Sequence, residues 1–590
     1  MNKLTRKCVA AVASLAMAGT LCVAGAVTVS SVAWAKPGPV QPSTDNSPWG
    51  NKKDKTGTLT INKFKYSDTV DSEGHHKGEA LNGATFTLKK VTKIGGVDLD
   101  YTKFETWSKI AGIVGALNRG DEASAKLTFE DNPNYTPTVT DNVTTFSKLP
   151  EGLYKVVETP PAGYGAADMT EFYITMPLIE TKTVDGATTT TYNWNPTINP
   201  KNKDISKTFT KKLDDGKDHN SVLAKDKTLY YTISASVNRT KSGTLSADDL
   251  NGFAVFDDFP TTAFTSPTDA SSAVESVKIG DGDSATELTK NTDYNVSIVK
   301  ASTEEGGKSL ESGRNRILVK FTDAGLKKIA DKLNGVTNGQ DPKVNVAIKL
   351  DLSEDYQKGT APTDTTSTEQ NGKNEVVNKS GFFPASTKST PDKDKPDPIV
   401  SGDGDDEGGT SKVKFGWFDV FKYDAADEGK QTKTGLAGAE FRLFNTEEKA
   451  NACAKKLVDA SKDANDVDEC KAGSSTFKSD EATTQETTGK LKEPVKVQAG
   501  TNIYLVEVKA PKDYMRLPEV KAVQVEEGKL KIVEFSNTKK SSESKWAWFN
   551  LPATGATGVI IFALAGMGLI AASVFLYMRN RKEEEQRQNA

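Results

Sequence analysis

Histidine is scarce in this chain, which has only three histidines among 590 residues. His75 and His76 are neighbours of the kind found in a solvated loop, and His219 stands alone, with no cysteine or carboxylate at metal-ligand spacing. A zinc site or a histidine-assisted nucleophile would need a richer set of side chains. We therefore expect no metal site and no cofactor, and we expect that the chain is not an enzyme.

An excess of charge of one sign is also missing. Lysine and arginine number 76 against 80 aspartates and glutamates, so the formal net charge is −4. Both signs are scattered along the chain, without the basic patch with which proteins neutralise phosphates. This distribution excludes nucleic acid as a partner.

The N-terminal end has the features of a signal peptide. A basic beginning with Lys3, Arg6 and Lys7 leads into an apolar stretch of small residues and then into Ala-Trp-Ala at positions 33–35. Such a segment directs export and is cleaved after the small residues. We predict a signal peptide over residues 1–35, followed by a flexible lead over 36–55 that is rich in proline, glycine and serine.

Only four cysteines are present. Cys8 and Cys22 belong to the predicted signal peptide, which leaves Cys453 and Cys470 in the exported chain. An exported protein meets an oxidising environment, in which an isolated pair of cysteines is expected to be oxidised. The sequence therefore predicts a disulfide between Cys453 and Cys470.

The C-terminal end combines a short motif, an apolar run and a basic tail. Residues 559–578 contain no charged side chain and are long enough to form a helix across the roughly 30 Å of a bilayer core. The tail, residues 579–590, begins with basic side chains, which favour the cytoplasmic side of a membrane. The motif that precedes both is Leu551-Pro552-Ala553-Thr554-Gly555.

This order of elements resembles the cell-wall sorting signal of Gram-positive surface proteins. In that family a membrane sortase cleaves between the residues that match Thr554 and Gly555 and passes the acyl group to an amine. The resemblance implies that the chain is a sortase substrate, held briefly by a membrane anchor and finally located at the cell wall.

Between its ends the sequence consists mainly of short runs with a period of two, such as Thr228–Val237, separated by turn residues. This pattern is typical of all-β sandwich domains of the immunoglobulin-like kind. One exception is Phe104–Leu117, where a short helix is predicted. The expected divisions are an N-terminal domain over 56–200, a middle domain over 201–388, an acidic linker rich in proline and glycine over 389–410, and a C-terminal domain over 411–540.

Two segments, Tyr154–Tyr164 and Tyr504–Tyr514, share a pattern. Each places one glutamate, Glu158 or Glu507, among apolar strand neighbours and before a turn with proline and a tyrosine. Burial among such neighbours raises the pKa of a carboxyl group and keeps it protonated. Both segments resemble the E-box of Gram-positive pilins.

Lys422 lies in the first strand expected for the C-terminal domain, and Asn537 lies in the last. The sequence around them resembles the collagen-adhesin B-repeat fold, in which such a lysine and asparagine form an internal isopeptide bond. Burial lowers the pKa of a lysine so that its neutral amine can attack, while a protonated glutamate polarises the asparagine amide. The resemblance implies Lys422 as the nucleophile, Asn537 as the electrophile and Glu507 as the acid.

The middle domain has no E-box, but Phe-Asp-Asp-Phe-Pro at 256–260 resembles the family's D-x-L-P strand end. The resemblance implies a bond between Lys207 and Asn378 that is promoted by Asp257. The sequence leaves open Lys211 or Lys212 as the amine and Asp258 as the acid.

In the N-terminal domain, Lys63 occupies the corresponding first strand. The only candidate partner that we name is Asn195, and the sequence does not decide whether this domain has a bond of its own.

The boundary between the first two domains carries Asn199-Pro200-Lys201-Asn202, shortly after Trp194. This resembles the motif W-x-x-x-V-x-V-Y-P-K-N of backbone pilins, whose lysine accepts the sorted threonine of the next subunit. The chain departs from that motif, because Asn199 replaces the tyrosine and Trp194 is two residues closer. The resemblance implies that Lys201, expected to be exposed, is joined to Thr554 of another subunit.

Taken together, these features resemble those of the major (backbone) subunit of a sortase-assembled Gram-positive fimbria. The partners implied are a pilin-specific and a housekeeping sortase, identical subunits, minor or tip pilins, and peptidoglycan. The alternative is a monomeric adhesin that is anchored to the cell wall and binds host matrix or glycans. Lys201 separates the two interpretations, since only a polymer needs it.

Overall fold

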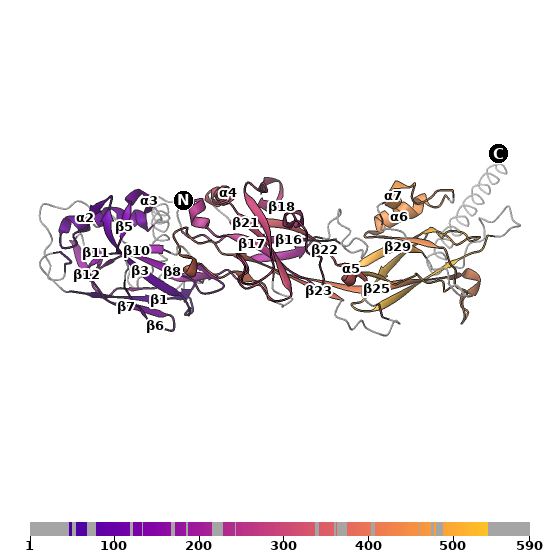
Figure 1. The fold of residues 1–590 in the computed structure, drawn as a ribbon, viewed down its shortest axis with the longest axis horizontal. Helices are drawn as coiled ribbons and strands as arrows, with labels where there is room; N and C mark the ends of the chain where they lie inside the picture. Colours follow the sequence, from indigo (N-terminus) through magenta and orange to yellow (C-terminus); the bar gives the residue numbers. More distant parts are fainter. Residues whose placement is uncertain are drawn as a thin grey trace, which may run out of the picture. The chain divides into compact units, whose positions relative to one another are not determined.

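The computed structural model of the chain is drawn in Figure 1. It describes residues 47–49, 55–67, 78–118, 122–131, 134–166, 171–184, 187–214, 228–241, 244–336, 341–358, 361–362, 374–402, 408–459, 461–471, 473, 477–478, 488–517 and 519–540. The predicted signal peptide, the LPATG motif and the apolar run at 559–578 lie outside the described residues. Within the described ranges, no helix is long and apolar enough to cross a membrane.

The chain divides into two compact units, with a boundary between Val413 and Lys414. The first unit contains the N-terminal and middle domains predicted from the sequence, and the second contains the C-terminal domain. Strands dominate all three domains, so the prediction of a mainly β fold is confirmed.

The N-terminal domain packs two sheets against each other (Figure 1). One sheet, in the order β13-β1-β7-β6, consists of β13 (Thr197–Ile198), β1 (Gly57–Asn62), β7 (Val143–Leu149) and β6 (Thr138–Thr140). The other, in the order β10-β8-β3-β4 with β5 beside β3, consists of β10 (Glu171–Met176), β8 (Gly152–Thr159), β3 (Thr85–Ile94), β4 (Val97–Asp98) and β5 (Leu127–Phe129). A small third sheet, β2-β14-β9, is formed by β2 (Phe64–Lys65), β14 (Lys201–Asp204) and β9 (Tyr164–Ala166).

The period of two in the sequence produces the core of this domain. Successive strand residues point to opposite faces, so Leu59 and Ile61 of β1 and Phe86 and Leu88 of β3 all enter the space between the sheets. Burial of apolar side chains of this size stabilises the domain by about 1.5 to 3 kcal/mol each.

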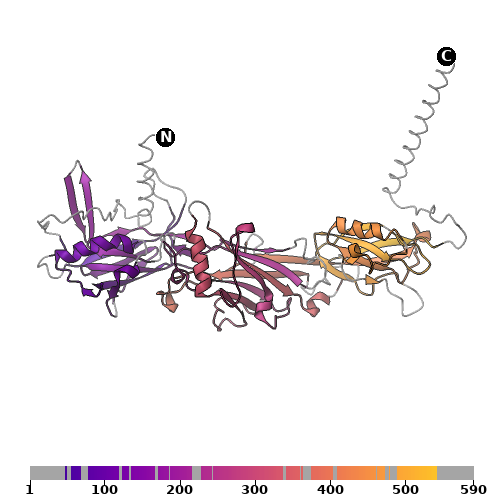
Figure 2. The same ribbon diagram turned by 90° about the horizontal axis from the view of Figure 1, so that it is seen from above.

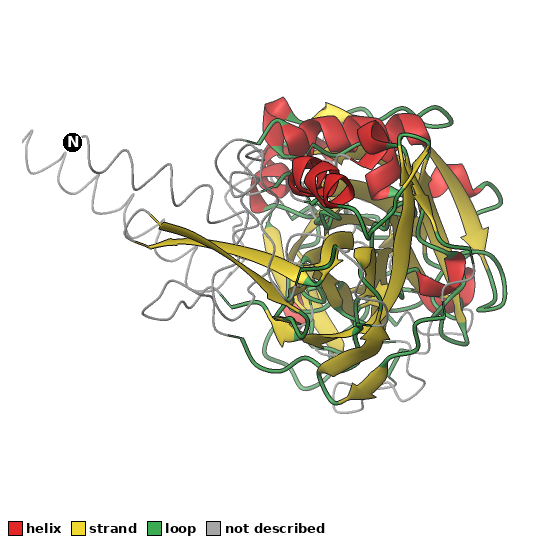
Figure 3. Cartoon of the chain, turned by 90° about the vertical axis from the view of Figure 1, so that its left-hand side faces the viewer, coloured by secondary structure: helices red, strands yellow, loops and turns green. Residues whose placement is uncertain are grey.

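The predicted helix at 104–117 is confirmed as α2 (Phe104–Leu117). It buries Trp107, Ile110, Val114 and Leu117, spaced by three and four residues, against the outer face of the second sheet. A second, short helix is α3 (Glu122–Ala125), and the strands β11 (Leu178–Val184) and β12 (Ala187–Asn193) pair only with each other among the described strands. Figures 2 and 3 show that this two-stranded ribbon stands away from the other sheets of the domain.

The middle domain also has two sheets. The first, in the order β15-β16-β22-β18-β19, consists of β15 (Phe209–Leu213), β16 (Thr228–Ala235), β22 (Val344–Asp351), β18 (Val274–Ile279) and β19 (Thr286–Glu287). The second, in the order β20-β21-β17-β23 with β24 beside β23, consists of β20 (Tyr294–Val299), β21 (Arg314–Phe321), β17 (Ala254–Pro260), β23 (Glu375–Phe383) and β24 (Ile399–Val400). Its helices are α4 (Asp323–Asn334) and α5 (Glu354–Lys358), with short 3₁₀ turns η1 (Ala247–Leu250), η2 (Ala270–Ala273), η3 (Gly282–Ser284) and η4 (Asp392–Asp394).

The segment 389–410, predicted as a linker, contacts the middle domain at several of its described residues. Val400 of β24 pairs with Gly381 of β23, and Ile399 beside it is buried. The Ser380 hydroxyl donates to the carbonyl oxygen of Gly409 at 2.7 Å. Ile399, Val400 and Gly409 are therefore folded onto the middle domain, because the apolar side chain of Ile399 and the backbone groups find partners there.

In the C-terminal domain, β25 (Thr410–Asp424) pairs with β28 (Val495–Gln498) and β31 (Leu530–Asn537). The facing sheet, in the order β27-β26-β29-β30, consists of β27 (Phe477–Lys478), β26 (Glu440–Phe444), β29 (Asn502–Lys509) and β30 (Val520–Gln524). The helices are α6 (Glu447–Lys456) and α7 (Asp468–Lys471), with a 3₁₀ turn η5 (Ala425–Asp427). Both α-helices pack on the outer face of the second sheet, against residues such as Val506 and Val508.

Candidate functional site

The C-terminal domain brings together the three side chains that the sequence assigned to it. Asn537 of β31 lies opposite Asp424 of the parallel strand β25, so it shares a face with Lys422, two residues earlier in register. Glu507, from β29 in the other sheet, reaches both. Its Oε1 lies 3.0 Å from Lys422 Nζ, and its Oε2 accepts a hydrogen bond of 3.0 Å from Asn537 Nδ2. All three residues are at most 2% exposed.

Burial sets the protonation of this cluster. It lowers the pKa of Lys422 to about 8 and raises the pKa of Glu507, because the charged forms lose their hydration. The backbone N–H of Leu517 donates to Glu507 Oε2 at 2.7 Å and fixes the position of the carboxyl group. Both pKa shifts favour a neutral amine beside a protonated acid, which is the state required for attack on an amide.

The middle domain contains a cluster of the same composition. Lys211 Nζ, from β15, contacts the carboxyl group of Asp257 in β17 and donates to the carbonyl oxygen of Lys379 at 3.1 Å. Asn378 Nδ2, from β23, lies 3.4 Å from the same carboxyl group. Burial lowers the pKa of Lys211 to about 8 and raises that of Asp257, as in the C-terminal domain.

Lys207, our first choice from the sequence, does not lie in this cluster. It is exposed in the turn that precedes β15, whereas the buried face of the strand begins only at Phe209. Lys211 follows Phe209 by two residues and shares its buried face, while Lys212 points the other way and is exposed. Of the three candidates, the geometry supports Lys211.

Asp258 has a different partner. The buried guanidinium of Arg316 donates to both of its carboxylate oxygens, at 2.7 and 2.8 Å, and stacks over the ring of Phe256. This bidentate ion pair compensates the negative charge of the Asp258 carboxylate. Asp257, by contrast, is the carboxyl group in contact with Lys211.

A third cluster lies in the N-terminal domain, and it includes a residue that our sequence reasoning missed. Lys63, between β1 and β2, places Nζ 2.8 Å from Glu158 Oε2. Asn202 Nδ2, from β14, donates to Glu158 Oε1 at 2.7 Å. Asn202 is fully buried, whereas Asn195, the sequence candidate, is exposed in a bend.

Asn202 was missed because the predicted domain boundary at residue 200 separated it from Lys63. In the structure, β14 continues the N-terminal domain, pairing in parallel with β2 and antiparallel with β9. The available signal was its place in the sequence Pro200-Lys201-Asn202, which we assigned to the linkage between subunits alone.

The three asparagines share a further property. The side-chain oxygens of Asn202, Asn378 and Asn537 are all buried and have no hydrogen-bond partner among the described residues. An unpaired buried amide oxygen is costly, and such groups occur where a reaction or strain needs them. These oxygens are the atoms on which negative charge would develop if an amine attacked the amide carbon.

The sequence predicted that Lys201 is exposed, but it is buried, with 7% of its surface exposed. Because Asn202 points inward to Glu158, the alternation of β14 directs Lys201 and Lys203 to the opposite face of the strand. Lys203 is exposed on that face, with its ammonium group 4.9 Å from the centre of the Tyr66 ring.

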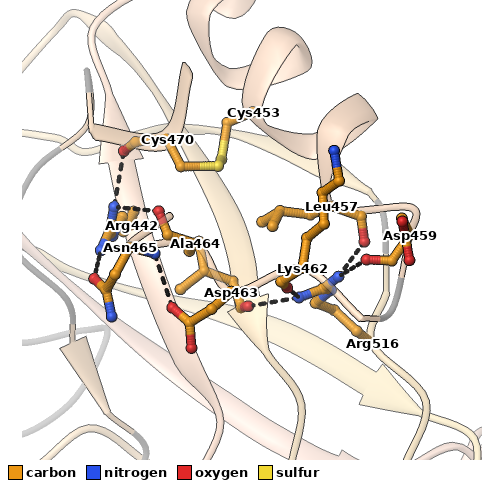
Figure 4. Close-up of a disulfide and its surroundings, with 11 residues drawn as sticks. Arg442, Cys453, Leu457, Asp459, Lys462, Asp463, Ala464, Asn465, Cys470 and Arg516 are labelled. Atoms are coloured by element: carbon orange, nitrogen blue, oxygen red, sulfur yellow. Dashed lines mark hydrogen bonds between the residues drawn. A yellow bond between two sulfur atoms is a disulfide. The ribbon is translucent and has the colours of Figure 1, made fainter. Parts of the chain in front are cut away.

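The predicted disulfide is confirmed. Cys453 of α6 and Cys470 of α7 are bonded, and they close a loop between the two helices on the outer face of the sheet (Figure 4). Both cysteines are fully buried.

Replacing Cys453 and Cys470 together with serine should lower the free energy of unfolding of the C-terminal domain by about 3 kcal/mol. The disulfide closes a loop over a sequence separation of 17, and such a closure restricts the unfolded chain. Denaturant unfolding of the mature chain, with Trp417 of β25 as a fluorescent probe, measures the change. As a control, thiol labelling of the unreduced, denatured wild type should find no free thiol, and two free thiols per chain would contradict the disulfide.

Three models of known protein families match parts of the chain. A model described as "Gram-positive pilin subunit D1, N-terminal domain" matches residues 43–203. A model of a prealbumin-like fold domain matches 422–539, and one of the LPXTG cell wall anchor motif matches 549–585. The chain is a sortase-assembled Gram-positive pilin subunit. The pilin is therefore a surface protein anchored to the cell wall.

Similar proteins are known from other bacteria. The pilin is 24% identical over 567 residues to the fimbrial subunit type 2 of Actinomyces naeslundii, with 90% of each chain covered. Two solved structures are the fimbrial protein FimP from Actinomyces oris and the major pilin SpaD from Corynebacterium diphtheriae. The first is 16% identical, with a TM-score of 0.42 and coverage of 84% of this chain and 100% of that chain. The second is 20% identical, with a TM-score of 0.40 and coverage of 84% and 99%.

Proposed function

We propose that this pilin is the backbone subunit of a covalent fibre and that each of its three domains is closed by an internal isopeptide bond. The bonds are Lys63–Asn202, Lys211–Asn378 and Lys422–Asn537. The observation that carries this proposal is the repetition of one arrangement, in which a buried acid contacts both a buried lysine and a buried asparagine amide.

The chemistry of each bond is an amide exchange. The neutral lysine amine attacks the side-chain carbon of the asparagine, a new C–N bond forms, the old C–N bond breaks, and ammonia leaves. The acid hydrogen-bonds the amide and passes protons from the amine to the departing nitrogen. Burial supports this role in the C-terminal and middle domains, where the lysine pKa is lowered and the acid pKa is raised.

The position of the bonds explains what they would do in a fibre. Lys211 is in the first strand of its domain, β15, and Asn378 is in β23, the last long strand of that domain. Lys422 and Asn537 likewise lie in the first and last strands of the C-terminal domain, β25 and β31. A covalent link between the first and last strands carries a pulling force past the sheets, so the domain does not unzip. It also restricts the unfolded chain, as a disulfide does.

Polymerisation would use Lys201, at the end of the N-terminal domain, and Thr554 of the LPATG motif. A pilin-specific sortase cleaves between Thr554 and Gly555 and transfers the Thr554 acyl group to Lys201 of an identical subunit, and a housekeeping sortase attaches the finished fibre to peptidoglycan. Minor or tip pilins would complete the fibre. Thr554 and Gly555, between which the sortase would cleave, lie outside the described residues. Support for this step comes from the match to the anchor motif.

Peptide mapping of the mature chain tests the internal bonds, with the N-terminal domain as the sharpest case. We expect three cross-linked peptide pairs, each lighter by one ammonia than the sum of its parts. Asn202→Ala should remove the pair that contains Lys63 and leave the other two. Asn195→Ala is the matched control and should leave all three, since Asn195 is exposed. A wild-type chain with separate Lys63 and Asn202 peptides would refute the bond.

A further inference from the structure

The segment 515–517 touches two of the three reacting groups in the C-terminal domain. The backbone N–H of Leu517 donates to Glu507 Oε2 at 2.7 Å. The carbonyl oxygen of Met515 accepts a hydrogen bond of 2.5 Å from Asn537 Nδ2. The backbone of this segment therefore fixes the acid and the amide relative to each other.

Arg516, between these two residues, donates hydrogen bonds to the loop that the disulfide closes (Figure 4). Its guanidinium donates to the carbonyl oxygens of Leu457, of Asp459 at 2.9 Å and of Lys462 at 3.1 Å. A further hydrogen bond of 3.1 Å goes to the carbonyl oxygen of Val508, the residue after Glu507 in β29. A single planar side chain with five donors thus joins the loop, the strand of the acid and the segment 515–517.

The loop that supplies these carbonyl groups is closed by the disulfide. The disulfide ties Cys453 to Cys470, so the backbone between them has fewer conformations than an open loop of the same length. Near Cys470 the loop is bound by a second arginine, Arg442, which donates to the carbonyl oxygens of Ala464 and Cys470 at 3.3 and 3.0 Å. Arg442 lies in β26 and leaves the partners of Arg516 untouched.

We propose that the disulfide-closed loop positions the segment 515–517 through Arg516, and that this positioning accelerates formation of the Lys422–Asn537 bond. Arg516 is then a positioning residue, since it contacts neither Lys422 nor Asn537 among the interactions of the described residues. The inference rests on the isopeptide bond proposed above for this domain. No additional reagent enters the step, because the amine, the amide and the acid are all supplied by the chain and ammonia is the leaving group.

The test follows bond formation in the whole chain over time. Cells are pulse-labelled, and the fraction of Lys422 joined to Asn537 is measured by peptide mapping, with the Lys211–Asn378 bond of the same molecules as the internal standard. Arg516→Ala should slow the C-terminal bond by roughly 10- to 100-fold, the range expected when a catalytic geometry is loosened. Arg516→Lys keeps the charge but loses the fork of donors, and it should recover only part of the rate.

Lys512→Ala is the matched control, since it removes an exposed cation four residues before Arg516. It should form the bond at the wild-type rate. The pair Cys453→Ser and Cys470→Ser should slow the bond in the same direction as Arg516→Ala. If the loop acts through Arg516, adding Arg516→Ala to the cysteine pair should cause little further loss, whereas independent effects would multiply.

The outcomes separate this inference from the proposal on which it rests. A wild-type chain without the Lys422–Asn537 peptide refutes the bond itself. A wild-type chain with the bond, together with an unchanged rate in Arg516→Ala, refutes the positioning role of Arg516. Multiplicative effects of the arginine and cysteine substitutions would show that loop and arginine act separately, and would refute the coupling between them.

Discussion

Alanine in place of Lys201 is expected to abolish the SDS-resistant ladder of covalent polymers in cell-wall extracts. The sortase-bound Thr554 acyl group would then have no amine on the next subunit, while monomer would still reach the wall through Thr554. Immunoblotting of wall extracts measures the result. A monomeric adhesin would give no ladder even in the wild type, so the same blot separates the two functions.

Lys203→Ala is the matched control for this experiment. Lys201 and Lys203 lie on the same face of β14, two residues apart, but Lys201 is buried and Lys203 is exposed. We expect Lys203→Ala to keep its ladder. Lys201 would have to be uncovered by the sortase before it could attack the acyl group, because it is buried. If Lys203→Ala loses the ladder and Lys201→Ala keeps it, exposure has decided the choice and our assignment from the motif is wrong.

Methionine in place of Lys211 should eliminate the isopeptide bond of the middle domain completely. Lys211 is the buried amine in contact with Asp257, and methionine fills a similar volume without an attacking nitrogen. Peptide mapping of the mature chain should show the Asn378 peptide alone, at its unmodified sequence mass, because no ammonia is lost. The bonds of the other two domains should form as in the wild type.

Lys207→Met provides the control for this substitution. Lys207 is exposed in the turn before β15, so its replacement should leave the cross-linked peptide unchanged. A chain that loses the cross-link in Lys207→Met and retains it in Lys211→Met would return the assignment to Lys207. Loss in both variants would indicate that the substitutions disturb the fold of β15 rather than the reacting amine.

The sequence by itself determined those features that depend on local pattern. The order of LPATG, apolar run and basic tail predicted a cell-wall sorting signal without a structure, and the match to the anchor motif supports that prediction. The helix at 104–117 follows from its apolar spacing, and the Cys453–Cys470 pair follows from counting cysteines in an exported chain. Lys422, Glu507 and Asn537 were found together because the E-box and the two terminal strands each carry their own local signature.

Only the tertiary structure decided the choices that depend on pairing between distant strands. A period of two places 207, 209 and 211 on one face, so sequence parity could not separate Lys207 from Lys211. The start of β15 at Phe209 does so, because it leaves Lys207 in a turn. The assignment of Asn202 to the N-terminal domain likewise depends on β14 pairing with β2 and β9.

The contact between Arg516 and the disulfide loop could not be anticipated for the same reason. The loop carbonyls precede the arginine by more than fifty residues, at separations of 54, 57 and 59. Backbone carbonyls are present at every position and leave no mark in the sequence, so the register of folded segments alone decides which of them a side chain reaches.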